Sequence, residues 1–505
     1  MRFLILMLYG FVLMHTAMVA PCEVEKVLPV PTQAQREWQE MELVFFVHFG
    51  INTFTDREWG DGREEPAIFN PTEFDANQWA EAVRDAGGKM IILTAKHHDG
   101  FCLFPSKYTE HSVKNSPWRD GNGDVVREVA DACRKAGLKF GVYLSPWDRN
   151  HPEYGNSPVY NQYFLNQLRE LLSNYGEIAE VWFDGANGEG PNGKRQVYDW
   201  EAYYTLIREL QPNAVVAIVG PDVRWVGNES GVARETEWSV QIVSEEGLND
   251  ARIRFNSTLS QGSTKYLADG VKTLKDVAFS HLSQNPEAVE EQAHLIWYPA
   301  ETDVSIRPGW FYHAAQDDEV KSLEHLVDIY FKSIGRGTVL LLNVPPDQRG
   351  LFHENDVQRL QELRQYVDQT FAVNLATGAK VQADSEHGEE FQAALLIDGD
   401  RDTSWAAAAD KETAGIILHL ESEKTFDVIM LQEPIQLGQR IAEFTVEVRT
   451  DTGWQEIAQG TTVGYKRLLR VAETSAEQVR IRIRKSRGCP VLHTVGLFKT
   501  PERDW

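Results

Sequence analysis

The chain has 505 residues, more than one ordinary domain uses, so two or three domains are expected. Its composition is that of a globular protein, with 42% hydrophobic and 25% charged residues and a formal net charge of −25 at pH 7. That charge argues against nucleic acid and anionic membrane surfaces as partners, because both would repel the protein, and it favours a neutral substrate.

Residues 1–21 resemble an export signal. An arginine at position 2 precedes an apolar run to about Ala20, which is too short for a spanning helix and has no stop-transfer flank. Cys22 raises the alternative of a lipoprotein, although Pro21 departs from the usual lipobox. The remaining cysteines give neither a disulfide framework nor a zinc pattern: Cys102, Cys133 and Cys489. We therefore expect an exported bacterial protein, periplasmic or at the cell surface, with no transmembrane segment after the signal.

Between residues 30 and 373, short apolar runs alternate with loops and amphipathic segments. The eight runs are LVFFVHFG (43–50), KMIILTAKHH (89–98), KFGVYLS (139–145), AEVWFDG (179–185), AVVAIVG (214–220), RETEWSV (234–240), HLIWYPAE (294–301) and TVLLLNVPP (338–346). Continuous apolar runs suit strands buried on both faces, as in parallel sheets. Eight such units predict a (β/α)8 TIM-like barrel. An open doubly wound sheet is the alternative, but no GxGxxG follows an early strand.

The pattern of apolar and polar residues changes after a helix predicted over 354–371. Short alternating runs such as GIILHL and QVRIRIRK, separated by turn residues, predict an all-β sandwich over 374–502. Asp398, Asp400 and Asp402 share one loop, which either binds a structural calcium ion or is a plain acidic turn. Beyond Trp405 and Trp454, few aromatic residues of this domain offer a stacking face for sugars, so we expect the domain to support the barrel rather than to bind sugar.

Polar side chains collect where the predicted barrel strands end, which is where barrels of this kind build their active sites. Asp184 ends the hydrophobic run VWFD, so it either caps the next segment or is a catalytic group on a rigid strand. The other candidates are His48, His97, His98, Tyr143, Arg224, Glu229, Glu301 and Trp310. Each has a structural explanation by itself, but carboxylates, imidazoles and indoles on one rim together suit a sugar site. Metal catalysis is disfavoured, because adjacent strand histidines point to opposite faces and no HExxH pattern occurs.

These motifs together resemble the α-L-fucosidases of glycoside hydrolase family 29. The matching stretches are VHFGINTF with EWG (47–60), AKHHDGFCLF (95–104), GVYLSPWD (141–148), VWFDGANG (181–188) and LLLNVPPDQRG (340–350). The resemblance implies a retaining hydrolase with a covalent fucosyl-enzyme intermediate, no cofactor for catalysis, and Asp184 as nucleophile. It also implies that six residues hold the fucose hydroxyls: His48, Glu58, Trp59, His97, His98 and Tyr143.

The acid/base is assigned from a second, narrower resemblance. The loop VRWVGNESG is similar to that of the subgroup that prefers α-1,3- or α-1,4-linked fucose in Lewis-type glycans, which implies Glu229 as acid/base. By its place in the same loop at a strand end, Arg224 is a candidate for substrate binding. Glu301 is the rival; it could instead hold the acceptor sugars, with Trp310 against the apolar side of fucose. Residues 374–500 resemble the discoidin-like (factor 5/8 C-type) sandwich. The alternatives are a glycosidase for another sugar and a catalytically silent glycan-binding protein.

Overall fold

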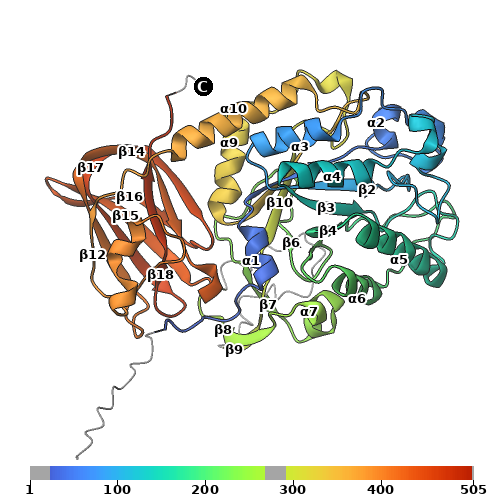
Figure 1. The fold of residues 1–505 in the computed structure, drawn as a ribbon. Helices are drawn as coiled ribbons and strands as arrows, with labels where there is room; N and C mark the ends of the chain where they lie inside the picture. The colour runs from blue at the N-terminus through green and yellow to red at the C-terminus, as the bar shows by residue number, and fades with distance from the viewer. Residues whose placement is uncertain (1–22, 268–291, 503–505) are drawn as a thin grey trace, which may run out of the picture.

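The structure is a computed structural model that describes residues 23–267 and 292–502. The predicted signal and Cys22 lie outside these residues. Figure 1 shows two domains side by side, an α/β domain and a β domain. Within the described part of the chain, no helix is both long and apolar enough to cross a membrane. Cys102, Cys133 and Cys489 are all buried and unpaired.

The α/β domain is a nearly closed barrel of eight parallel strands in the order β5-β4-β3-β2-β1-β11-β10-β6. These strands are β1 (Leu43–Val47), β2 (Met90–Lys96), β3 (Lys139–Leu144), β4 (Glu180–Phe183), β5 (Val215–Ile218), β6 (Arg224–Trp225), β10 (Ala300–Ser305) and β11 (Val339–Asn343). The connection between the two end strands, β5 and β6, closes on Val216, whose carbonyl oxygen accepts hydrogen bonds from the amides of Asp222 and Val223. The predicted barrel is confirmed.

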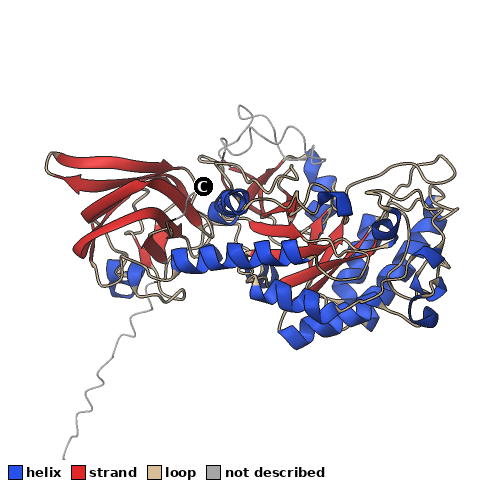
Figure 2. Cartoon of the chain, turned by 90° about the horizontal axis from the view of Figure 1, so that it is seen from above, coloured by secondary structure: helices blue, strands red, loops and turns tan. Residues whose placement is uncertain are grey.

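Helices cover the outside of the barrel (Figure 2). Those of the α/β domain are α1 (Gln33–Gln39), α2 (Ile51–Thr55), α3 (Ala76–Asp85), α4 (Val125–Ala136), α5 (Ser157–Asn174), α6 (Trp200–Leu210), α7 (Ala251–Phe255), α9 (Leu323–Lys332) and α10 (Glu354–Phe371). Helix α4 illustrates how the sequence specifies them. Asp124 caps its first turn by accepting a hydrogen bond from the Arg127 amide, and Gly137 ends it in the left-handed conformation. Val126, Val129 and Cys133 then form one buried face.

Two strand predictions were wrong. The run 234–240 is not the sixth barrel strand, whose place is taken by the two-residue β6. The run 294–301 spans two strands: β9 (Gln292–Trp297) pairs antiparallel with β7 (Val240–Val243) and β8 (Ser260–Ser263), and β10 alone joins the barrel. The physical reason is that the apolar side chains of β9 are buried against a separate cluster that includes Tyr465 of the β domain. A buried apolar run does not identify the sheet that buries it.

The second domain is the predicted β-sandwich type of fold. Its main antiparallel sheet has the order β12-β14-β17-β15-β16, with β19 also paired to β14, and β13 pairs with β18. The strands are β12 (Lys380–Ala383), β13 (Trp405–Ala406), β14 (Ala414–Gln432), β15 (Ile441–Thr450), β16 (Gly453–Gly460), β17 (Arg467–Ser486), β18 (Val491–Leu492) and β19 (Thr494–Phe498). Helix α10 ends at Phe371, and the Asn374 side chain already donates a hydrogen bond to the Val495 carbonyl of this domain.

The β domain packs against the amino end of the barrel strands. Glu42, the residue before β1, accepts hydrogen bonds from the Tyr465 hydroxyl and the Lys466 ammonium group. Arg467 pairs with Glu235, which also pairs with Arg336, three residues before β11. Since barrel active sites lie at the carboxyl ends of the strands, this interface is at the opposite end from the expected site.

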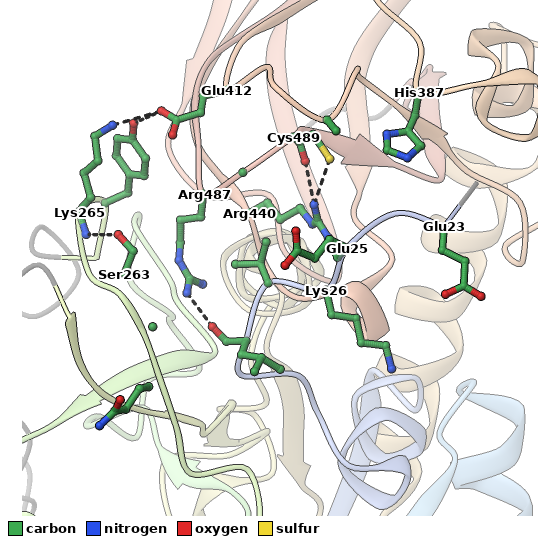
Figure 3. A pocket seen from close by; sticks show the side chains of 17 residues that line it. Glu23, Glu25, Lys26, Ser263, Lys265, His387, Glu412, Arg440, Arg487 and Cys489 are labelled. Carbon is green, nitrogen blue, oxygen red and sulfur yellow. Dashed lines mark hydrogen bonds and ion pairs between the residues drawn. The ribbon is translucent and has the colours of Figure 1, made fainter. Parts of the chain in front are cut away.

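Where the two domains meet the segment from Glu23 to Leu28, they line an open pocket of about 570 Å³ (Figure 3). Arg440 donates to the Glu25 carbonyl and Arg487 to that of Leu28, so these two cations tie the N-terminal segment to the β domain. None of the candidate site residues lines this pocket.

Candidate active site

Asp184 follows β4 directly and lies at the carboxyl end of the barrel. All four residues of β4 are buried, whereas the Asp184 side chain is 26% exposed. Its Oδ1 accepts a hydrogen bond from the Ala186 amide at 2.6 Å, and its Oδ2 accepts one from the Tyr143 hydroxyl at 3.2 Å. The next helix begins only at Trp200, so Asp184 does not cap it. One oxygen holds the turn, and the other is turned toward the site.

Tyr143 and His98 flank the second oxygen of Asp184. Burial and the charge of Asp184 raise the pKa of Tyr143 well above its ordinary value. The phenol therefore keeps its proton and donates a hydrogen bond to the Asp184 carboxylate. His98 Nε2 lies 3.8 Å from Asp184 Oδ2. The Ser145 hydroxyl donates to the Trp147 carbonyl, so His98 Nδ1 donates to Ser145 Oγ at 2.7 Å and Nε2 presents a lone pair.

His48 and His97 complete a group of neutral imidazoles, because burial lowers the pKa of all three histidines. The pKa of His48 falls to about 3. Asn343 Oδ1 accepts from both the His48 amide and the His48 ring at Nδ1, which leaves Nε2 as an acceptor. The ring centroids of His48 and His97 lie 5.6 Å apart. Neutral rings with one lone pair each are suited to accept hydrogen bonds from sugar hydroxyl groups.

Glu58 fastens the loop that carries Trp310. Its two carboxylate oxygens accept hydrogen bonds from the amides of Trp310 and Phe311 and from His313 Nε2, the last at 2.7 Å. Trp59 is 56% exposed and meets the ring of His98 edge-on at 5.7 Å. The structure therefore places Trp59 beside His98, while Glu58 contacts the loop through two backbone amides and the His313 ring.

Glu229 lies on an exposed loop after β6, at the rim of the same group. Its Oε2 accepts a hydrogen bond from the Trp310 indole at 3.3 Å. The Trp310 ring in turn lies 5.2 Å from the ring of His48. A chain of contacts thus joins Glu229 through Trp310 and His48 to the residues around Asp184.

Glu301 and Arg224 are not brought to this rim. Glu301 is the second residue of β10 and 0% exposed, and its Oε1 accepts a hydrogen bond from the Trp182 indole inside the barrel. Burial, together with the neighbouring carboxyl group of Glu180, raises the pKa of Glu301 well above its ordinary value. Arg224 is also buried, where its guanidinium pairs with Glu237 and donates to the carbonyl of Tyr298.

Sequence reasoning missed three residues that shape the site. Asn343 orients His48, Trp182 stacks on Tyr143 with a centroid distance of 5.2 Å, and Asp303 accepts a hydrogen bond from the Trp225 indole at 2.7 Å. A signal was available for Asn343, which ends the apolar run LLLN much as Asp184 ends VWFD. Asp303 could be found only after β10 had been placed at 300–305.

The structure gives no sign of a metal centre in residues 23–267 and 292–502, where no group of three or more His, Cys, Asp or Glu side chains is arranged to hold an ion. In the loop predicted as a calcium site or an acidic turn, Asp398 Oδ1 accepts from the Asp400 amide and Asp400 Oδ1 from the Asp402 amide. These are the hydrogen bonds of successive Asx turns. The calcium ion remains a prediction.

Comparison with known families decides the assignment. Residues 29–370 match the family model described as alpha-L-fucosidase, which is more than half of the chain. The chain belongs to the α-L-fucosidase family. It is a glycoside hydrolase of family 29, and residues 380–494 of this fucosidase match the F5/8 type C domain.

Relatives align with the fucosidase over nearly its whole length. Alpha-L-fucosidase 1 of Arabidopsis thaliana is 41% identical over 485 residues, which are 95% of this chain and 88% of that protein. The crystal structure of a putative alpha-L-fucosidase from Bacteroides ovatus has 49% identity and a TM-score of 0.80, and the alignment covers 94% of this chain and 75% of that one. A Ruminococcus gnavus GH29 fucosidase in complex with fucose has 33% identity and a TM-score of 0.81, with 95% and 97% covered.

Proposed function

We propose that the protein is a retaining, exo-acting α-L-fucosidase in which Asp184 is the nucleophile and Glu229 is the acid/base. The observation that supports this most is the position of Asp184, a partly exposed carboxylate on the tip of a buried strand, with Oδ2 turned toward Tyr143. A nucleophile needs a rigid mount, and a strand in the barrel wall provides one. Glu229 is favoured over Glu301 because it is exposed at the rim, whereas Glu301 is inside the barrel.

In the first step, Asp184 Oδ2 attacks the anomeric carbon of fucose while the glycosidic bond breaks. The Glu229 carboxyl group gives its proton to the departing oxygen, so the leaving sugar is released as an alcohol. In the second step Glu229 takes a proton from water, the resulting hydroxide attacks the anomeric carbon, and Asp184 leaves as a carboxylate. The Tyr143 hydroxyl stays protonated throughout, because its pKa is raised well above the ordinary value, and it stabilises the anionic form of Asp184.

Binding of fucose falls to the neutral imidazoles and the aromatic rings. His48 and His98 each present a lone pair, so they accept hydrogen bonds from fucose hydroxyl groups, and Trp310 offers an apolar face. The chemistry requires no metal or organic cofactor. An overall charge of −25 suits this neutral sugar.

The preferred substrates are glycans that end in α-1,3- or α-1,4-linked fucose, of the Lewis type. This rests on the resemblance of the loop VRWVGNESG (223–231), which carries Glu229 at the rim. We further propose that the protein is exported and acts in the periplasm or at the cell surface of a bacterium, on the resemblance of residues 1–21 to a signal. Lipid attachment at Cys22 is the alternative to a free form.

The test is fucose release from a Lewis-type trisaccharide and from 2′-fucosyllactose. Release from the Lewis glycan alone supports the proposed linkage preference. Equal release from both removes the linkage proposal and leaves the fucosidase activity. Proton NMR of the first sugar formed tests the mechanism, because a retaining enzyme must release α-fucose before mutarotation, whereas release of β-fucose would rule out a covalent intermediate on Asp184.

A further inference from the structure

Asp303 is a buried carboxyl group beneath the loop that carries Glu229, and the mechanism above does not use it. It is 4% exposed and sits in the middle of β10, two residues after Glu301. Its Oδ1 accepts a hydrogen bond from the Trp225 indole at 2.7 Å. The neighbouring Thr302 is turned differently, since its hydroxyl donates to the Val339 carbonyl on the adjacent strand.

The loop between Trp225 and Gly231 is fastened to β10 at both ends. The Val226 amide donates to the Glu301 carbonyl at 2.9 Å, and the Gly231 amide donates to the Asp303 carbonyl at 3.1 Å. Gly231 has a φ of +70° and lies against Val304, where an added Cβ atom would meet Val304 Cγ1 at 2.9 Å. The loop therefore follows the position of β10, and the Trp225–Asp303 hydrogen bond adds a side-chain anchor four residues before Glu229.

The state of Asp303 is set by its surroundings. Burial raises its pKa well above the ordinary value, the Trp225 hydrogen bond offsets part of that rise, and the charges of Glu301 and Glu229 raise it further. The raised pKa favours the protonated, neutral form of the Asp303 carboxyl group. A neutral carboxyl group has one carbonyl oxygen to accept the indole proton, as an asparagine side chain has.

We infer that Asp303 is a positioning residue for the proton donor: its carboxyl group holds the Trp225 indole, and thereby the loop that keeps Glu229 at the leaving-group side of the site. This inference rests on the proposed role of Glu229. If Asp303 acts through Glu229, its loss matters in proportion to how much the leaving group needs a proton. A sugar alcohol needs that proton, whereas an activated nitrophenol departs without it.

The experiment measures kcat/KM for a Lewis trisaccharide and for 2-chloro-4-nitrophenyl α-L-fucoside with wild type, Asp303→Ala, Asp303→Asn and Trp225→Phe. Asp303→Ala and Trp225→Phe should each lose ~30-fold on the trisaccharide and less than ~3-fold on the aryl fucoside. Asp303→Asn should stay within ~3-fold of wild type on both, because the amide keeps a neutral carbonyl acceptor. Thr302→Ala, a buried change on the same strand, is the control and should affect both substrates alike.

Hydrogen exchange of the amides in 226–231 supplies a readout that needs no turnover. Asp303→Ala should speed exchange of this loop ~10-fold, while Asp303→Asn should not. Unchanged exchange in Asp303→Ala, equal losses on both substrates, or damage by Asp303→Asn equal to that by Asp303→Ala would each overturn the inference. If wild type cleaves neither substrate, the proposed function fails, and the exchange data alone decide whether Asp303 holds the loop.

Discussion

The two ends of the barrel differ in the charge state of their polar residues. At the amino end, Glu42 contacts Lys466 and Tyr465, so a partly buried charge is paired with a partner of opposite sign. At the carboxyl end, His48 and its neighbours are buried without charge, and burial depresses their pKa values. The amino end is built for stability and the carboxyl end for binding. The buried polar residues at the carboxyl end are therefore expected to destabilise the fold, and the ion pairs at the amino end to stabilise it.

The largest effect on the catalytic side is expected from Asp184→Asn. An amide cannot attack the anomeric carbon, so kcat should fall at least ~10⁴-fold on both Lewis glycans and aryl fucosides. Stability should be unchanged or slightly higher, because one partly buried charge is removed. The checks are single-turnover fucose release and thermal unfolding. Full activity in a variant verified by mass spectrometry would remove Asp184 from the mechanism.

Glu229→Gln should give the next largest loss. Removal of a general acid costs ~10²–10⁴-fold in kcat when the leaving group is a sugar. On an activated aryl fucoside the first step should be nearly unaffected, so that only the second step slows and added azide restores turnover. The matched control is Glu301→Gln, which alters a carboxyl group inside the barrel. If Glu301→Gln lost activity on the sugar substrate and regained turnover of the aryl fucoside with azide, while Glu229→Gln kept wild-type activity, Glu301 would be the acid/base instead of Glu229.

The sequence predicted the barrel better than it predicted the side chains inside it. Continuous apolar runs located six of the barrel strands, since burial on both faces leaves a strong local signal. β6 leaves almost none, because only Arg224 and Trp225 form it. Motif residues such as Asp184 and His48 were found at strand ends. Glu301 and Arg224 were placed at the rim because the sequence gives neither the strand start nor the register that turns each side chain inward.

His48→Phe should lower catalytic activity less than the two carboxylate variants do, and it should make the stability of the fold less sensitive to acid pH. Removing one acceptor of a sugar hydroxyl group is expected to lower kcat/KM ~10²-fold. The pKa of His48 is about 3 in the folded protein, below its ordinary value of 6.5. As the pH falls from 6.5 towards 3, His48 becomes protonated in the unfolded chain but stays neutral in the folded protein. The wild type therefore loses stability over this pH range. The variant should lose less between pH 7 and pH 4.5 in urea unfolding, and equal losses would contradict the account.

Glu42→Gln should leave catalysis nearly unchanged and weaken the fold. Breaking this partly buried pair leaves Lys466 uncompensated, at a cost of about 2 kcal/mol in the free energy of unfolding, between that of an exposed pair and that of a fully buried one. Burial alone would raise the pKa of Glu42, but Lys466 and Tyr465 outweigh it and lower the pKa. The stabilisation is therefore full above the ordinary pKa of glutamate and is lost as the pH falls through the lowered value.

The control for Glu42→Gln is Glu443→Gln, which breaks the exposed pair with Lys485 and should cost less than ~1 kcal/mol. Urea unfolding at pH 7 and pH 3 measures both variants. The difference in the free energy of unfolding between wild type and Glu42→Gln should be smaller at pH 3 than at pH 7. A variant that loses kcat in proportion to its stability would show that the two ends of the barrel are not as separate as proposed.

The central claim, that a rigid strand tip presents Asp184 as the nucleophile, is tested most directly by trapping the intermediate. The wild type would be incubated with a 2-deoxy-2-fluoro fucosyl fluoride, which slows the second step more than the reaction with the nucleophile, and the labelled peptide would be identified by mass spectrometry. The account predicts one fucosyl adduct per chain, on Asp184 within VWFDGANG. An adduct on Glu229 or Glu301, or inactivation without any covalent adduct, would contradict it.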